Sequence, residues 1–280
     1  MLSRFTFEAL CSLGQRFGGI RPRRIYDWLA RLAFPEPSHR WATDRYGLEL
    51  YLSPHSHIDR CILAFGEYES GIHRLLEQVI KPGMICLDVG ANIGHIALRM
   101  AQLGAVVHAF EPTPPIYQIL ELNSQRNGFL NLFIHPLALS DRDGEALIAY
   151  ARPEVENQGM GSIVNMNNLV VSEVTSVPAM RLDTFTQKHS LARIDFIKLD
   201  VQGAEPLFWL GGEKTISKHK PIVVTEISGE DLNAGGRTVS DFINLIEASG
   251  YRVEPLGARA IGDSNHNTAN AICIPLNCST

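Results

Sequence analysis

Short apolar runs alternate with longer segments of helical periodicity over most of the chain from residue 84 onward. The apolar runs resemble strands buried on both faces, and the segments between them carry apolar residues three and four positions apart, as amphipathic helices do. The expected strands cover 85–89, 106–110, 132–137, 194–199 and 222–227, and the expected helices cover 93–103, 115–127, 203–218 and 238–249. This alternation predicts an α/β fold, in which helices cover both faces of a parallel sheet.

The segments on either side of this core are more varied. A short strand is expected at 47–52 and a helix at 72–80, and two strands near 251–254 and 271–275 would complete the far edge of the sheet. Residues 151–177 are rich in Asn, Gly and Val and are expected to form an insertion over the sheet. We therefore divide the chain into a helical N-terminal extension, residues 1–46, and one domain, residues 47–280.

Composition and charge narrow the function. The chain has 280 residues, of which 45% are hydrophobic and 20% charged, and a net charge of -5, values typical of a globular protein. This balance argues against general nucleic-acid binding, which favours basic proteins. Residues 1–46 carry eight arginines against four acidic residues, a net charge of +4, which leaves -9 for the remainder. We expect this extension to be a helical cap, with weak contact to a membrane surface or an anionic partner as the alternative.

Five cysteines, an odd number without a Cys-x-x-Cys pair, indicate neither a disulfide framework nor a zinc site. No uncharged apolar run reaches the roughly 18–20 residues that span a bilayer, and charged residues interrupt the N-terminus where a signal peptide would be apolar. We therefore expect a cytoplasmic protein with no transmembrane segment. The sequence does not indicate the oligomeric state.

The first expected strand-to-helix turn, residues 87–94, reads Leu-Asp-Val-Gly-Ala-Asn-Ile-Gly. Gly90 and Gly94, with Asn92 between them, allow the backbone to approach a ligand closely, and the helix that begins there favours a small anion. Asp88 is expected either to bond an ammonium group or to hold the glycine loop. The pattern is not Gly-x-Gly-x-x-Gly, so the dinucleotide fingerprint is missing.

An acidic residue also ends the second strand: Glu111 lies 23 positions after Asp88. A carboxylate at this place can accept hydrogen bonds from both ribose hydroxyls of a nucleoside. The anion-binding turn and the ribose acid together predict a cofactor that contains adenosine. After the third strand, the backbone near Leu139 or the carboxylate of Asp141 is the candidate partner of the adenine amino group. Asp141 has an alternative role, which is to begin the turn of residues 141–144.

Two further acids end neighbouring strands. Asp200 follows the fourth strand and Glu226 ends the fifth, so both are expected at the crevice where a doubly wound sheet binds its ligand. Paired carboxylates facing a cofactor are the best candidates for catalysis in this sequence.

From about residue 47 to residue 275 the chain resembles the FkbM-type family of S-adenosylmethionine-dependent methyltransferases. The resemblance rests on segments in the family's order and spacing: 66–69, 87–94, 109–112, 138–141, 182–185, 197–205 and 221–226. One position differs, because the family usually reads Asp-Val-Glu-Gly-Ala-Glu and this chain carries Gln202 in place of the first Glu. If that position is catalytic, activity is in doubt; if it shapes the loop, a neutral amide serves.

The resemblance implies a Rossmann-like class I methyltransferase fold, with a seven-stranded, mostly parallel sheet whose last strand runs antiparallel. It also implies O-methylation of a sugar, glycan or polyketide-like metabolite, with S-adenosylmethionine as cofactor. The anion at the turn becomes the methionine carboxylate, and Glu69 or Asp88 becomes the partner of the cofactor's ammonium group. Glu111 would hold the ribose, and Asp141 or the backbone before it the adenine.

Methylation of a hydroxyl needs a base to remove its proton. We expect Asp200 to be this base and Glu226 to orient the acceptor or share the proton. In the alternative, the two carboxylates hold magnesium or calcium, which acidifies a sugar hydroxyl; we expect no metal. Two other classes of function are a nicotinamide-dependent oxidoreductase and a scaffold that binds the cofactor without turnover. The acceptor is not encoded in a recognisable motif, and loops at 53–75, 151–177 and 228–237 are expected to cover it.

Overall fold

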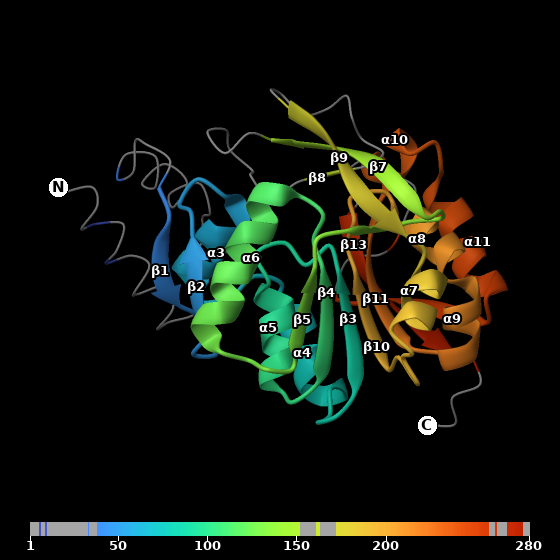
Figure 1. Cartoon of the computed structure of the whole chain (residues 1–280), viewed down its shortest axis with the longest axis horizontal. Coiled ribbons are helices and arrows are strands. Elements are labelled where there is room, and N and C mark those ends of the chain that lie inside the picture. Colours follow the sequence, from blue (N-terminus) through green and yellow to red (C-terminus); the bar gives the residue numbers. More distant parts are fainter. Residues whose placement is uncertain are drawn as a thin grey trace.

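The computed structural model describes residues 38–151, 161–162, 172–257, 261 and 268–276, together with residues 6, 9 and 33 singly. Figure 1 shows the chain coloured along its sequence, with the central sheet flanked on two sides by helices. The expected helical extension lies outside the described residues up to residue 37, except for the three single residues. The next residues, 38–46, form a strand and the turn that follows it.

Seven strands form the central sheet, as expected. From one edge to the other, they are β12 (Tyr251–Pro255), β13 (Thr268–Pro275), β11 (Ile222–Ser228), β10 (Phe196–Leu199), β3 (Ile85–Val89), β4 (Val106–Phe110) and β5 (Leu132–His135). All neighbours pair in parallel except β13, which runs antiparallel to both β11 and β12. The strand order reverses between β3 and β10, and such a switch point is where doubly wound sheets bind their ligands.

Helices cover both faces of the sheet, with α4, α5 and α6 on one side in Figure 1 and α7, α8, α9 and α11 on the other. Their bounds are α4 (Ser70–Val79), α5 (His95–Gln102), α6 (Pro114–Asn127), α7 (Leu182–Lys188), α8 (Glu205–Gly211), α9 (Glu213–His219) and α11 (Val239–Ala248). The inner strands are largely apolar because consecutive side chains enter different layers. In β3, Cys86 packs into the core beneath α5, and Leu87 packs into the core that contains Phe208 and Trp209 of α8.

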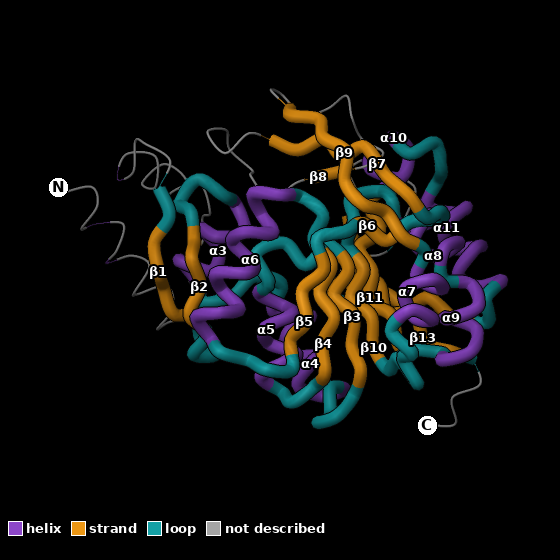
Figure 2. Tube along the Cα trace, viewed as in Figure 1, coloured by secondary structure: helices purple, strands orange, loops and turns teal. Residues whose placement is uncertain are grey.

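A second, smaller sheet lies beyond the carboxyl ends of the central strands, above them in Figure 2. Its order is β6 (Ala138–Leu139), β9 (Ser172–Met180), β7 (Gly144–Ala151) and β8 (Gly161–Ser162). The expected insertion at 151–177 is therefore, where it is described, largely the end of a long antiparallel β7–β9 pair. Its remaining residues lie outside the described part of the chain.

Four other elements complete the described fold. These are the antiparallel pair β1 (Arg40–Thr43) and β2 (Glu49–Leu52), and the helices α3 (His57–Phe65) and α10 (Gly229–Ala234). Ser56 begins α3, since its hydroxyl accepts a hydrogen bond from the amide of Asp59. None of the described helices is long and apolar enough to cross a membrane.

The expected helix at 203–218 is two helices, α8 and α9, that meet at Gly211 and Gly212. A Cβ atom on Gly211 would lie 1.9 Å from the carbonyl oxygen of Ser140, so only glycine fits against the β6 segment there. The chain bends at this contact, which the helical periodicity of the sequence does not reveal.

Candidate functional site

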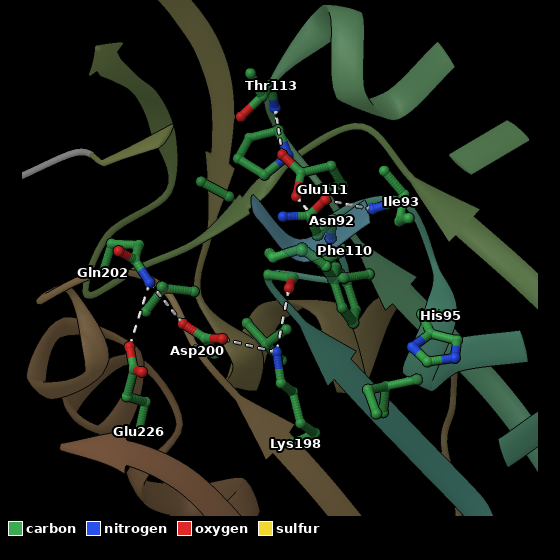
Figure 3. Close-up of a pocket in the computed structure, with 18 of the residues that line it drawn as sticks. Asn92, Ile93, His95, Phe110, Glu111, Thr113, Lys198, Asp200, Gln202 and Glu226 are labelled. Atoms are coloured by element: carbon green, nitrogen blue, oxygen red, sulfur yellow. Dashed lines mark hydrogen bonds and ion pairs between the residues drawn. The ribbon is translucent and has the colours of Figure 1, made fainter. Parts of the chain in front are cut away.

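A cavity of about 640 Å³ opens at the carboxyl ends of β3, β4, β10 and β11, on the switch point of the sheet. Its size is within the range of about 300–1,000 Å³ that is typical of small-molecule sites. The start of α3, the α3–α4 loop, the β6–β7 region and α10 also contribute lining residues. Figure 3 shows the polar side chains that converge in it.

The β3–α5 turn forms one wall of the cavity, through Gly90, Ala91, Asn92 and Ile93. The amides of Gly90 and Ala91 both donate to the carbonyl of Phe110, at 3.0 and 2.9 Å, and so join the turn to β4. Because these amides are already used by the protein, they are not free to bind an anion.

The two glycines of this turn serve packing. A Cβ atom on Gly90, which has φ +78°, would lie 1.8 Å from the carbonyl oxygen of Asp200. A Cβ atom on Gly94 would lie 2.2 Å from Leu120, and Gly94 does not line the cavity. Gly90 therefore lines the cavity and also admits the backbone of Asp200, whereas Gly94 admits Leu120 and lies outside the lining.

Glu111 enters the cavity from the end of β4, at the top of Figure 3. Each carboxylate oxygen accepts one backbone hydrogen bond, from the amide of Asn92 at 3.0 Å and from that of Thr113 at 2.9 Å. These bonds fix the carboxylate, and a carboxylate oxygen can accept a further hydrogen bond through its second lone pair. Burial raises the pKa of Glu111 in spite of its hydrogen bonds. Glu111 thus offers two oriented acceptor atoms, which match a ligand with two adjacent hydroxyl groups.

Lys198, a buried residue of β10, lies among three carboxylates. Its ammonium is 3.1 Å from a carboxylate oxygen of Asp200 and 3.5 Å from the carbonyl oxygen of Gly90. Burial alone would lower the pKa of Lys198, but Asp200, Asp88 and Glu69 outweigh it and raise the pKa. Lys198 is therefore a permanent positive charge that compensates for the acids around it.

Asp88 lies in β3 and is fully buried, outside the lining of the cavity. Burial raises its pKa to about 6, opposed by Lys198. Neither carboxylate oxygen has a hydrogen-bond partner of good geometry among the described residues, although the backbone of Ala97 is near enough to lower the pKa slightly. Glu69, in contrast, lines the cavity, and one of its oxygens accepts a hydrogen bond from Asn270 at 3.2 Å.

Asp200 and Glu226 lie on the same side of the cavity, at the left in Figure 3, with Gln202 between them. The Gln202 amide nitrogen donates to Asp200 at 2.9 Å and to Glu226 at 3.3 Å. Burial, and next the charge of Asp200, raise the pKa of Glu226 well above its ordinary value. Asp200 differs from Glu226 because it is paired with Lys198.

Glu205 fixes the loop that carries Gln202. Its two carboxylate oxygens accept hydrogen bonds from the amide of Val201 at 2.9 Å and from that of Gly203 at 3.0 Å, on either side of Gln202. The side chain is buried, and burial raises its pKa to about 7.

Three cavity residues have a left-handed backbone, which is unfavourable for side chains other than glycine. Their φ angles are 55° for Glu69, 52° for Asn92 and 54° for Gln202. The two other described non-glycine residues with positive φ, Ser190 and Lys220, lie at the ends of helices outside the cavity. Strained backbone of this kind concentrates at functional sites.

Of the two candidates near the third strand, only one lines the cavity. Leu139 is buried in the cavity wall, next to Ala138. Asp141 does not line the cavity; its side chain accepts a hydrogen bond from Ser140 at 3.2 Å, and its carbonyl accepts one from Arg181 at 3.0 Å. The geometry thus brings together Glu69, Gly90, Asn92, Glu111, Leu139, Asp200 and Glu226, and places Asp88, Gly94 and Asp141 outside the lining.

Several residues of the site are absent from the candidates drawn from sequence, among them Lys198 and His95. Lys198 is detectable in principle, as a lone lysine in an otherwise apolar strand. His95 lines the cavity at the first turn of α5, and its Nε2 lies 3.0 Å from a carboxylate oxygen of the buried Asp44. The other oxygen of Asp44 accepts from the amides of Tyr46 and Leu48, so the β1–β2 turn fixes His95. No local pattern indicates this contact across 51 residues.

The chemistry of the cavity is that of an acidic site with one fixed cation. Its lining includes Lys198 and the carboxylates of Glu69, Glu111, Asp200, Glu226, Glu230 and Asp231. Such a cavity favours a ligand with positive charge and hydroxyl groups. Among the described residues, no group of three or more His, Cys, Asp or Glu side chains is arranged to hold a metal ion.

Known proteins resemble this chain over the same region. A family model described as the methyltransferase FkbM domain matches residues 88–253. The chain is 30% identical over 189 residues to 2-O-methyltransferase NoeI of Sinorhizobium fredii, covering 62% of this chain and 76% of that protein. It is 24% identical over 221 residues to 31-O-demethyl-FK506 methyltransferase FkbM of Streptomyces tacrolimicus, covering 70% of this chain and 78% of that protein.

A solved structure, methyltransferase FkbM from Methylobacillus flagellatus, superposes with a TM-score of 0.44 and 15% identity, over 76% of this chain and 52% of that one. The matched residues 88–253 include the carboxyl ends of β3, β4, β10 and β11, which surround the cavity.

Proposed function

The chain belongs to the FkbM family of methyltransferases and is an enzyme that methylates a hydroxyl oxygen with S-adenosylmethionine, and we propose here how its cavity holds the donor and activates the acceptor. The nicotinamide-dependent oxidoreductase is not favoured, since the chain lacks the dinucleotide fingerprint. The donor supplies a methyl group that its positive sulfonium already activates. The protein must therefore position two ligands and remove a proton.

Glu111 holds the ribose of the donor. Its two oxygens are fixed by the amides of Asn92 and Thr113 and face the cavity. Leu139 and the backbone of the β5–β6 region contact the adenine. Asp141 plays no direct part in this proposal, because its side chain and carbonyl are turned to other parts of the protein.

Glu69 binds the ammonium group of the donor. The sequence leaves Glu69 and Asp88 as alternatives, and only Glu69 lines the cavity. Asp88 instead lies beneath the cavity, where its charge favours the protonated form of Lys198. The positive charge of Lys198 in turn compensates for the repulsion among the carboxylates of Asp88, Asp200 and Glu69.

The acceptor hydroxyl lies against Asp200 and Glu226, and Glu226 removes its proton. The sequence suggests the reverse division of roles, with Asp200 as the base. Both carboxylate oxygens of Asp200 already have partners within the protein, Lys198 at 3.1 Å and the Gln202 amide at 2.9 Å. Burial raises the pKa of Glu226, which makes its ionised form a stronger base. Asp200 then orients the acceptor.

The acceptor is a hydroxyl of a sugar, a glycan or a polyketide-like metabolite. Two relatives support oxygen as the methylated atom, since the names 2-O-methyltransferase and 31-O-demethyl-FK506 methyltransferase both denote methylation of oxygen. No metal takes part in the proposed reaction, because the amide of Gln202 lies between the two carboxylates that would hold one. Turnover is expected to be unchanged in EDTA. A loss that magnesium restores would instead favour a cation held by Asp200 and Glu226.

One observation carries the proposal. A single cavity has the Glu111 carboxylate, a fixed hydrogen-bond acceptor, at one side and the carboxylates of Asp200 and Glu226 at the other. Isothermal titration calorimetry should detect binding of S-adenosylhomocysteine and no binding of NAD. Tight binding of NAD without S-adenosylhomocysteine would contradict the proposal.

Transfer of a radiolabelled methyl group to a panel of sugar and macrolide alcohols then tests catalysis. Glu226→Gln should lower turnover by about 100-fold or more, the usual contribution of a general base, and keep the affinity for S-adenosylhomocysteine within about threefold. Unchanged turnover in this variant would remove Glu226 from the mechanism. Cofactor binding without transfer to any alcohol would favour the scaffold alternative.

A further inference from the structure

Gln202 is the point where the loop after β10 meets both carboxylates of the proposed acceptor site. A side-chain amide has two N–H hydrogens, and here the same nitrogen reaches Asp200 at 2.9 Å and Glu226 at 3.3 Å. The opposite orientation of the amide would direct its oxygen at two carboxylates. The contacts therefore use both hydrogens of the amide, one for each acid.

The backbone is held in an unfavourable conformation to make this contact. Gln202 has φ 54°, a region that glycine occupies at much lower cost than a residue with a side chain. Glu205 enforces this conformation, because it accepts the amides of Val201 and Gly203 on both sides. If the loop needed only its shape, glycine would suit position 202 better than glutamine.

We propose that Gln202 is a positioning residue, whose amide bridges Asp200 and Glu226 and holds the two carboxylates at a fixed separation in front of the acceptor. The part that concerns catalysis rests on the proposed function. The bridge itself does not, because it is a property of the protein without ligands.

The bridge also affects when Glu226 loses its proton. A hydrogen bond donated to the ionised carboxylate stabilises it and lowers its pKa, against the burial that raises it. The other charged or titratable groups that act on Glu226 are Asp200, Glu205, Glu69, Lys198 and Tyr68. Of these only Lys198 is a cation, and it contacts Asp200 directly. Removal of the Gln202 amide therefore leaves Glu226 facing mainly negative charge.

Gln202→Gly is the most informative variant. It removes the bridge and relieves the left-handed strain, so the protein should fold with an unchanged or higher Tm. Lys220→Gly is the matched control, since Lys220 has φ 49° at the end of α9, outside the cavity. Gln202→Glu is the second variant, of similar shape, in which a carboxylate replaces the amide and adds a third acid to the pair.

The experiment is a carboxyl-carbon NMR titration of the full chain labelled with ¹³Cδ-glutamate, without donor or acceptor. Glu226→Gln identifies the Glu226 signal by its loss. The midpoint of Glu226 should move to higher pH by about one unit or more in Gln202→Gly and in Gln202→Glu, and stay in place in Lys220→Gly. An unchanged midpoint in either Gln202 variant would overturn the proposal. Because no acceptor is involved, failure of the proposed methylation would leave this outcome unaffected.

Discussion

Glu111→Gln tests the donor site at its best-defined residue. The carboxylate accepts the amides of Asn92 and Thr113, one at each oxygen, at 3.0 and 2.9 Å. Glutamine keeps one acceptor oxygen and places an NH₂ group where the second oxygen was. The backbone N–H of Asn92 or Thr113 then faces the N–H donors of the glutamine side chain. One ribose hydroxyl loses the carboxylate oxygen that accepts its hydrogen bond.

The expected effect on affinity follows from the bond to the ligand. A hydrogen bond to a charged group contributes about 1.5–3 kcal/mol, which corresponds to about a 10- to 150-fold weaker Kd for S-adenosylhomocysteine. Isothermal titration calorimetry measures this change directly, and thermal unfolding shows whether the variant is folded.

Glu121→Gln is the control for this substitution. Glu121 lies on α6 outside the cavity, where it accepts a hydrogen bond from Tyr117. Its loss should leave the affinity unchanged. If folded Glu111→Gln protein binds S-adenosylhomocysteine within about threefold of the parent, Glu111 does not hold the ribose and the assignment of the donor site is wrong.

Two further predictions concern stability. Gly90→Ala and Gly47→Ala both strain a left-handed backbone, at φ 78° and 81°, which costs roughly 1–2 kcal/mol. Only Gly90→Ala also puts a Cβ atom 1.8 Å from the carbonyl oxygen of Asp200. Urea unfolding should therefore show that Gly90→Ala lowers the free energy of unfolding by more than about 4 kcal/mol. An equal decrease in the two variants would contradict this close contact. Burial raises the pKa of Glu205 from 4.5 to about 7, so its contribution to stability is complete below pH 4.5 and falls by about 3 kcal/mol as the pH rises to 7. The free energy of unfolding of Glu205→Gln, measured with urea at pH 5 and pH 7, should not show this decrease. If the variant has the same pH dependence as the parent, Glu205 is not its cause.

The sequence predicts the central sheet well because its strands are buried on both faces. Residues 85–89 and 106–110 are expected as strands and are strands with the same bounds. Less of the β7–β9 pair is predictable, since only part of it packs inward: Leu147 and Val174 are exposed while Ile148 is buried. The helix α3 lies within residues 53–75, which are expected to be a loop, although a Ser56 cap followed by apolar residues at helical spacing indicates a helix there.

Candidate residues at strand ends are predictable because parallel strands bring their carboxyl ends to one edge. Glu111, Asp200 and Glu226 reach the same cavity for this reason. Contacts that depend on tertiary packing are not predictable in this way. The pairing of Asp44 with His95 spans 51 residues, and the roles of Gly90 and Gly94 depend on neighbours that are distant in the chain.

A crystal structure of the complex with S-adenosylhomocysteine tests the central claim most directly. The account predicts that both ribose hydroxyls lie within hydrogen-bond distance of the Glu111 carboxylate, and that the sulfur faces the side of the cavity formed by Asp200 and Glu226. A ribose that does not contact Glu111, or a sulfur that faces away from these two carboxylates, would contradict it.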